Sequence, residues 1–230
     1  MRIAYATAYD ARSPVSWSGT EYFMWNALQG DGVEVDLIGP LDQPLPQLWK
    51  GKAWLYRRVL HSRYQIERQP WLQRHYARQV SARLEAGNYD LVLSPGTIPI
   101  AYLETSKPVV YWTDATFAGM IDFYPSFTNL ARETVRDGNA GEQAALERCS
   151  LAIYASEWAA GTARQHYRVD PSKLRVVPLG ANLRREPTAE EVAVAIAGRP
   201  TDECRLLFVA VEWDRKGGDT AVRVTGELLR

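Results

Sequence analysis

The sequence is poor in several residue types, and each shortage excludes a class of protein. Its 230 residues include only two cysteines, Cys149 and Cys204, and three histidines. The cysteines allow one disulfide at most and match no metal-ligand spacing, so we expect two buried free thiols and no bound metal. No apolar run approaches the roughly 18 residues that span a bilayer, and the chain opens on a strand pattern instead of a signal peptide. We therefore expect a cytoplasmic protein.

Three common functional signatures are also missing. The loop after the first predicted strand has one glycine where a dinucleotide fingerprint needs G-x-G-x-x-G, which disfavours NAD or FAD binding. The segment Ser94-Pro95-Gly96-Thr97 lacks the G-x-S-x-G elbow, so nothing supports a serine hydrolase. The net charge is zero, with 27 basic and 27 acidic residues, which argues against a general nucleic-acid-binding protein.

Short apolar runs alternate with helical patterns through the first 180 residues. Each run is bounded by turn residues, as is typical of strands that helices cover on both sides. The pattern therefore predicts an α/β, Rossmann-like parallel sheet with helices on both faces. We expect strands at 2–7, 33–38, 90–94, 108–112, 151–155 and 174–179, and helices from Gly19 and at 54–61, 71–84, 129–137, 141–149 and 156–167.

The composition changes after Gly180, where a polar connector begins. We place a first domain at 1–182, a connector with a short helix at 183–204, and the first βα unit of a second, truncated Rossmann-like unit at 205–230. Thr188 and Glu191 have the spacing of a capping box. The predicted strand at 205–211 is apolar and cannot be covered by one helix alone, so we expect either a continuation of the chain or self-association.

Two segments have the pattern of a phosphate site. Ser18-Gly19-Thr20 stands where the first strand turns into the first helix, a place where free N–H groups favour an anion. Lys216 precedes a second helix start and could pair with a diphosphate. The alternatives are an ordinary helix cap with a tightly packed glycine at the first segment and a solvated basic turn at the second.

Residues 47–83 combine nine basic residues and one acidic residue with six aromatic ones. Trp54, Arg57 and Arg58 belong to a predicted amphipathic helix that could lie on an anionic membrane, with its apolar arc in the headgroup zone. The alternative is a helix whose apolar arc packs on the sheet and whose cations are solvated. Nucleic acid is a weaker third interpretation.

An ordered set of segments resembles one enzyme family over almost the whole chain. Ser156-Glu157-Trp158, the stretch 173–182, and Leu206-Leu207-Phe208-Val209-Ala210 followed by Lys216-Gly217 look like segments of the retaining GT-B glycosyltransferases of family four, the group 1 type. This resemblance implies an amino-terminal acceptor domain and a carboxy-terminal domain for the nucleotide-sugar. It also implies transfer with retention, usually without a metal or other cofactor, and in many relatives to lipid-linked acceptors.

The chain departs from the family pattern at two positions. Val211 stands where many members carry an arginine for the diphosphate, which leaves Lys216 as the evident cation. Thr113 stands where a histidine is common, before Asp114. The Asp114 carboxylate could accept a hydrogen bond from a sugar hydroxyl or cap the turn at 115–119.

We therefore expect a glycosyltransferase that uses a nucleotide-sugar and a glycan or glycolipid acceptor, with most of the donor site outside this chain and the chain inactive alone. Lys216, Ser18, Gly19 and Thr20 are the expected phosphate residues, and Thr113 and Asp114 the expected sugar contacts. No residue is assigned a catalytic role. The alternative function is a non-catalytic module of the same fold that binds a glycan or a partner subunit.

Overall fold

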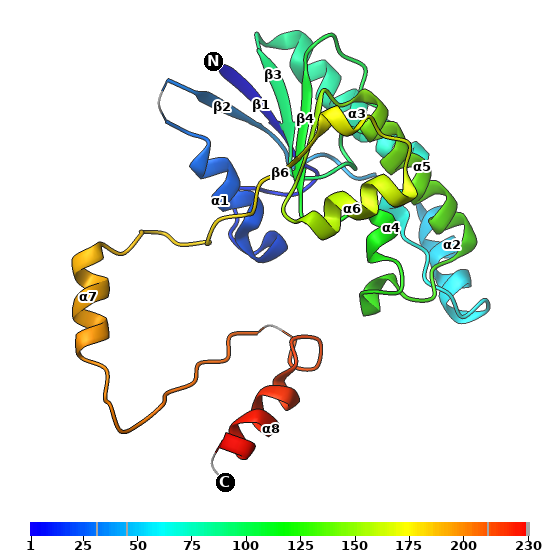
Figure 1. Ribbon diagram of the computed structural model, residues 1–230. Helices are drawn as coiled ribbons and strands as arrows, with labels where there is room; N and C mark the ends of the chain where they lie inside the picture. The colour runs from blue at the N-terminus through cyan, green and yellow to red at the C-terminus, as the bar shows by residue number, and fades with distance from the viewer. Residues whose placement is uncertain (31, 45, 211, 229–230) are drawn as a thin grey trace. The chain divides into compact units, whose positions relative to one another are not determined.

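A computed structural model describes residues 1–30, 32–44, 46–210 and 212–228. Its described residues form a six-stranded sheet in the order β2-β1-β3-β4-β5-β6, with every neighbouring pair parallel (Figure 1). The strands are β1 (Arg2–Ala6), β2 (Glu34–Ile38), β3 (Leu91–Ser94), β4 (Val109–Thr113), β5 (Leu151–Tyr154) and β6 (Leu174–Val176). The predicted α/β, Rossmann-like parallel sheet is confirmed.

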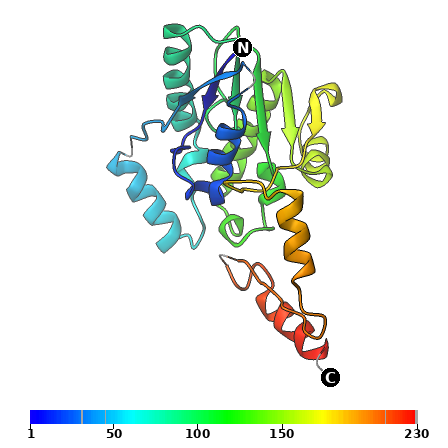
Figure 2. The same cartoon turned by 90° about the vertical axis from the view of Figure 1, so that its left-hand side faces the viewer.

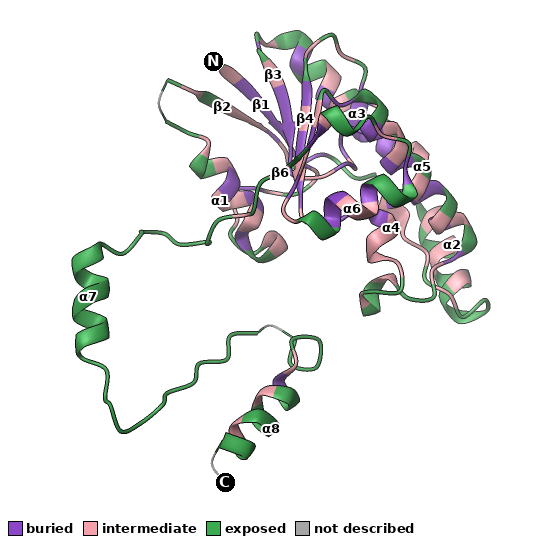
Figure 3. Cartoon of the chain, viewed as in Figure 1, coloured by how far each residue is buried: buried purple, intermediate pink, exposed green. Residues whose placement is uncertain are grey.

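Helices cover both faces of this sheet because alternate residues of each strand point to opposite sides. Ala4 and Ala6 of β1 belong to one hydrophobic core with α3 (Pro70–Ala86), α5 (Arg132–Arg148) and α6 (Glu157–His166). Ile3 and Tyr5 belong to a second core with α1 (Thr20–Ala27). Figures 2 and 3 show this layering and the buried strands.

Local signals set the ends of several helices. Pro70 opens α3, and the Ser156 hydroxyl accepts a hydrogen bond from the Ala159 N–H at the start of α6. The short helix α4 (Phe117–Met120) begins at Thr116, whose hydroxyl accepts from the Gly119 N–H. Thr116, and not Asp114, therefore caps this turn.

The two helices predicted at 129–137 and 141–149 are one continuous helix, α5. Gly138 lies between the two predicted helices and Gly141 begins the second, but neither glycine interrupts the helix. Both glycines instead face close neighbours: a Cβ on Gly138 would lie 2.2 Å from the Phe117 ring, and one on Gly141 would lie 2.3 Å from the Gln73 side-chain oxygen. The missing side chains let α5 pack tightly against α4 and α3.

Helix α2 (Gln47–Arg58) differs from the predicted helix at 54–61 in position and in packing. It ends before Val59 and has no buried residue, so its apolar residues do not pack on the sheet. Tyr56 faces inward, stacked on Tyr64, and Lys52 pairs with Glu133 at 2.6 Å. Leu55, Trp54 and Val59 are exposed, because these aromatic and ionic contacts hold the opposite side of the helix.

The chain divides into two compact units, Met1–Leu183 and Arg184–Arg230. The second contains α7 (Ala189–Ala197), which starts with the predicted capping box of Thr188 and Glu191, and α8 (Gly218–Leu228). The strand predicted at 205–211 is wrong for residues 205–210, which form no strand. They have no strand partner in the described part of the chain, and Leu207 is 88% exposed. Val211 lies outside the described residues.

Two further expectations concern the cysteines and membrane spans. Cys149 is a buried free thiol as predicted, whereas Cys204 is exposed, because its segment packs against no core. Within the described residues, no helix is both long and apolar enough to cross a bilayer.

Candidate functional site

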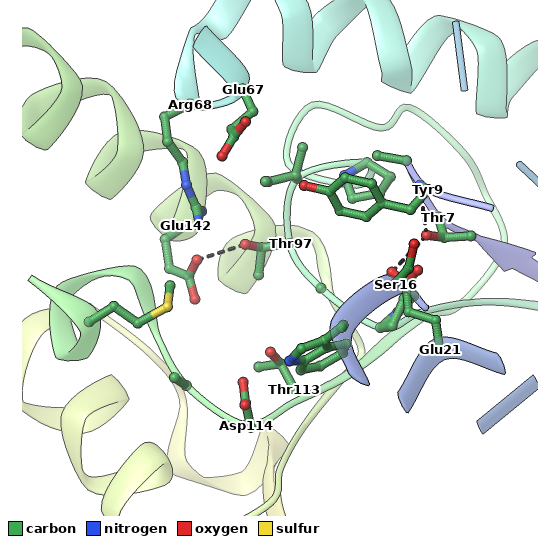
Figure 4. A pocket seen from close by; sticks show the side chains of 18 of the residues that line it. Thr7, Tyr9, Ser16, Glu21, Glu67, Arg68, Thr97, Thr113, Asp114 and Glu142 are labelled. Atoms are coloured by element: carbon green, nitrogen blue, oxygen red, sulfur yellow. Dashed lines mark hydrogen bonds between the residues drawn. The ribbon is translucent and has the colours of Figure 1, made fainter. Parts of the chain in front are cut away.

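A cavity of about 500 Å³ opens at the carboxyl ends of β1, β3 and β4. In the sheet, β2 lies on one side of β1 and β3 lies on the other side. The direction in which successive strands are added therefore reverses between β1 and β3. Open α/β sheets bind their ligands at such a switch point. The residues that line the cavity include Thr7, Tyr9, Ser16, Trp17, Glu21, Glu67, Arg68, Thr97, Thr113, Asp114, Met120, Phe127 and Glu142 (Figure 4).

One wall of the cavity is built from the loop after β1 and the first turn of α1. The Thr7 hydroxyl donates a hydrogen bond of 2.9 Å to Glu21 Oε1, and both side chains are buried. Burial raises the pKa of Glu21, and the Thr7 hydrogen bond opposes that rise. Glu21 therefore presents a carboxyl group of weakened acidity inside the protein.

A second wall brings together three distant segments. Thr97, after β3, donates to Glu142 Oε2 at 2.7 Å, and Arg68 lies over the Phe117 ring at 4.5 Å. Figure 4 shows Arg68 and Glu142 together, across the cavity from Thr7 and Glu21. Burial raises the pKa of Glu142, while the Arg68 charge, the Thr97 hydrogen bond and the Phe117 backbone N–H lower it.

Asp114 and Thr113 lie where the sequence placed them, at the end of β4, and both line the cavity. Burial raises the pKa of Asp114. Hydrogen bonds from the Asp114 backbone N–H and the Trp17 side chain oppose that rise. This carboxyl group is thus within reach of a ligand in the cavity.

Ser18, Gly19 and Thr20 form the turn into α1 but do not line the cavity; Ser16, Trp17 and Glu21 on either side of them do. Trp17, Ser18 and Gly19 all have positive φ angles, of 46°, 53° and 84°. Such backbone is strained for the two non-glycine residues, and strain of this kind concentrates at functional sites. The Ser18 carbonyl accepts a hydrogen bond from Asn182.

Lys216 belongs to the second unit, in the exposed turn before α8. The turn has Gly217 at a φ of 77°, and the Trp213 ring covers Gly218 so closely that a Cβ there would lie 2.2 Å away. Trp213 Nε1 also donates to Asp219 at 2.9 Å. These contacts fix the turn locally and leave the Lys216 side chain in solvent.

Sequence reasoning missed Glu21, Arg68 and Glu142. Each lies on a helical segment, where charged residues are usually solvated, and no local pattern marks them. Arg68 did fall within the basic segment 47–83, but it was counted there as one cation among nine. In the described part of the chain, no three His, Cys, Asp or Glu side chains converge as metal ligands.

The sequence model of Glycosyltransferase Family 4 matches residues 23–185, more than two thirds of the chain. The chain belongs to this family. As a member of Glycosyltransferase Family 4, it has a glycosyltransferase-type function with a sugar donor and an acceptor as its substrates. No curated protein matches the chain.

The match covers part of the candidate site. Arg68, Thr97, Asp114 and Glu142 lie within the residues matched to Glycosyltransferase Family 4. Thr7 and Glu21 precede the matched range, and Lys216 follows it. The family assignment therefore rests on the first unit.

Proposed function

We propose that this protein transfers a sugar from a nucleotide-sugar to a glycan or glycolipid acceptor with retention of the anomeric configuration. The observation that carries the proposal is the cavity at the β1/β3 switch point of a family member. In the proposal, residues 1–182 form the acceptor side of a GT-B fold and 183–204 a connector. Residues 205–230 begin the nucleotide-sugar unit.

Asp114 is the proposed sugar contact, because its carboxylate lies in the cavity wall and accepts hydrogen bonds. Thr113 lines the same wall and offers a hydroxyl group. The Lys216 ammonium is proposed to pair with the donor diphosphate, and the turn Ser18-Gly19-Thr20 remains a predicted phosphate contact. Catalysis would then depend on positioning and on charge stabilisation by protein groups, without a metal ion.

An assay of the protein produced from its whole gene tests the proposal. Candidate nucleotide-sugars are incubated with glycan and lipid-linked acceptors, with and without a chelator, and NMR reads the anomeric configuration of the product. We expect a product that retains the donor configuration and a rate that chelation leaves unchanged. Inversion or a strict metal requirement would contradict the corresponding part of the proposal.

Two variants test the assigned residues in that assay. Asp114→Asn should lower kcat/KM about tenfold or more, because a hydrogen bond to a charged group is lost. Asp122→Asn, an exposed change eight positions away, serves as the control. Lys216→Ala should raise KM for the nucleotide-sugar, and unchanged donor affinity would remove Lys216 from the site.

The alternative is a non-catalytic module that binds a glycan through the same cavity. It is supported by the resemblance given in the sequence analysis, in which Thr113 stands where a histidine is common beside Asp114. Glycan binding without transfer, under every donor tested, would favour this alternative over the enzyme.

A peripheral membrane contact through residues 47–83 is part of the proposal. Helix α2 exposes Trp54, Leu55, Arg57 and Arg58, and its contacts with the rest of the first unit lie on the opposite side. Exposed apolar and basic groups together suit an anionic bilayer surface. We expect co-sedimentation with phosphatidylglycerol vesicles that falls when Arg57 and Arg58 become glutamate. Arg83→Glu, at an exposed site on α3, should have less effect.

A further inference from the structure

Two buried glutamates in the cavity each have one oxygen that the protein leaves without a partner. Glu21 and Glu142 are 4% and 3% exposed. Each uses one oxygen to accept from a threonine that follows a central strand. The other oxygens, Glu21 Oε2 and Glu142 Oε1, have no hydrogen-bond partner among the described residues. The Phe117 N–H lowers the pKa of Glu142, but it makes no hydrogen bond of good geometry with Oε1.

A buried donor in the same cavity is also unsatisfied. Arg68 is 7% exposed, and its Nε has no hydrogen-bond partner in the described part of the chain. The guanidinium is held over the Phe117 ring, so it cannot turn away into solvent without losing that contact. Three residues that line the cavity, from three separate segments, therefore each have a buried polar atom without a partner: two acceptors and one donor.

Buried polar atoms without partners are rare in native proteins, because each has lost its water without a replacement. When they line a cavity, the missing partner is a ligand or a bound water. A hydroxyl group suits this set of atoms, because it can donate to a carboxylate and accept from a guanidinium. A ring that carries several hydroxyl groups could satisfy more than one of these atoms at once.

The charge of the cavity wall disfavours an acidic ligand. Four acidic residues line it, Glu21, Glu67, Asp114 and Glu142, against one basic residue, Arg68. A carboxylate or phosphate could pair with Arg68, but it could not donate to the glutamates and would be repelled by them.

We propose that this cavity binds an uncharged polyhydroxylated ring, a sugar or cyclitol unit of the acceptor, and that Glu21, Glu142 and Arg68 select it over acidic analogues. Calling this ring part of the acceptor rests on the proposed function. The binding of a neutral ring, and its preference over acidic rings, does not. Tyr9 and Trp17, which also line the cavity, offer aromatic faces for the apolar side of such a ring.

The methionines provide a direct measurement on the chain itself. There are three, and only Met120 lines the cavity, while Met24, on α1, is buried in the second core. With ¹³C-methyl methionine, the probes are methyl α-glucoside, methyl α-mannoside, myo-inositol, glucuronate and glucose 6-phosphate at equal ionic strength. Met120→Leu assigns the reporter signal.

We expect at least one neutral ring to shift the Met120 methyl signal in a saturable way and to leave Met24 unchanged. Its affinity should exceed that of the acidic sugars about tenfold or more, the effect of one charge-assisted hydrogen bond. Equal or tighter binding of the acidic sugars would overturn the proposal. So would the absence of a Met120 shift with every neutral ring, since the cavity would then hold water only.

Glu142→Gln tests the residue assignment, because it removes the charge and keeps the shape. It should lower the affinity for the neutral ring about tenfold and reduce the discrimination against glucuronate. Glu147→Gln, an exposed change on the same helix, is the matched control. Glu21→Gln gives an independent reading if the first variant fails to fold. Neutral-ring binding, combined with no sugar transfer by the protein produced from its whole gene, would refute the proposed function and leave this inference standing.

Discussion

Two short apolar segments of this molecule have different structures: one is a buried strand, and the other is exposed and forms no strand. Leu91–Ser94 is β3, with parallel neighbours β1 and β4 on its two sides and buried residues throughout its carboxyl half. Residues 206–209, Leu-Leu-Phe-Val, belong to no strand, and Leu207 and Val209 are 88% and 82% exposed. An apolar run becomes a strand only when neighbouring backbone pairs with it and helices cover its faces.

The largest expected difference between these segments is in amide exchange. The amides of β3 should exchange only through extensive unfolding, whereas those of 206–209 should exchange at nearly unprotected rates. The rates should differ about a thousandfold or more for a domain of ordinary stability. Exchange followed by mass spectrometry at several protein concentrations measures this.

Strong protection of 206–209 in a monomer would contradict the comparison. Protection that appears only as concentration rises would instead show that self-association covers the segment, and sedimentation velocity would detect the oligomer.

The alkylation rates of the two cysteines provide a second test of the difference between the packed sheet and the exposed segment. Cys149 is 1% exposed, and burial raises the pKa of its thiol to about 11, whereas Cys204 is exposed. At pH 8 iodoacetamide should alkylate Cys204 about a hundredfold faster, because the thiolate is the reactive form and Cys149 is mostly protonated. Raising the pH toward 11 increases the Cys149 thiolate fraction and should narrow the ratio. Comparable rates at pH 8 would show that the α5 terminus opens readily.

The smallest expected effects are the changes in stability caused by two glycine substitutions. Gly138→Ala places a methyl group 2.2 Å from the Phe117 ring and should lower the free energy of unfolding of the first unit by about 2 kcal/mol. Gly226→Ala in α8 meets nothing within 4 Å and should raise local helix stability by about 0.5–1 kcal/mol. Urea unfolding followed by near-ultraviolet circular dichroism measures the first.

The control for the first unit is Gly161→Ala, on α6, where an added Cβ also meets no atom within 4 Å. If Gly138→Ala lowered the free energy of unfolding no more than Gly161→Ala does, that result would contradict the close packing of α5 on Phe117.

The sheet could be predicted from sequence because each of its strands is short, apolar and bounded by turn residues. The Leu206–Val209 run shows the limit, since the same local pattern there lacks neighbours. Asp114 and Thr113 were found because their place after the fourth predicted strand resembles a family motif that commonly ends in His-Asp. Glu142 and Arg68 were not, because they are 74 residues apart and their burial depends on packing between helices.

The close packing of α5 also determines how deep the cavity is. Gly138 and Gly141 lie one turn before Glu142 or beside it, and they allow the helix backbone to approach Phe117 and Gln73. Glu142 is the one residue that α5 contributes to the described cavity wall. The position of the Glu142 carboxylate in the cavity therefore depends on Gly138 and Gly141, which do not line the cavity themselves. A side chain at Gly138 would press on the rigid Phe117 ring, 2.2 Å from a Cβ there, and should shift α5 together with Glu142. We therefore expect that the size of the accepted ring can be changed without altering any residue that lines the cavity.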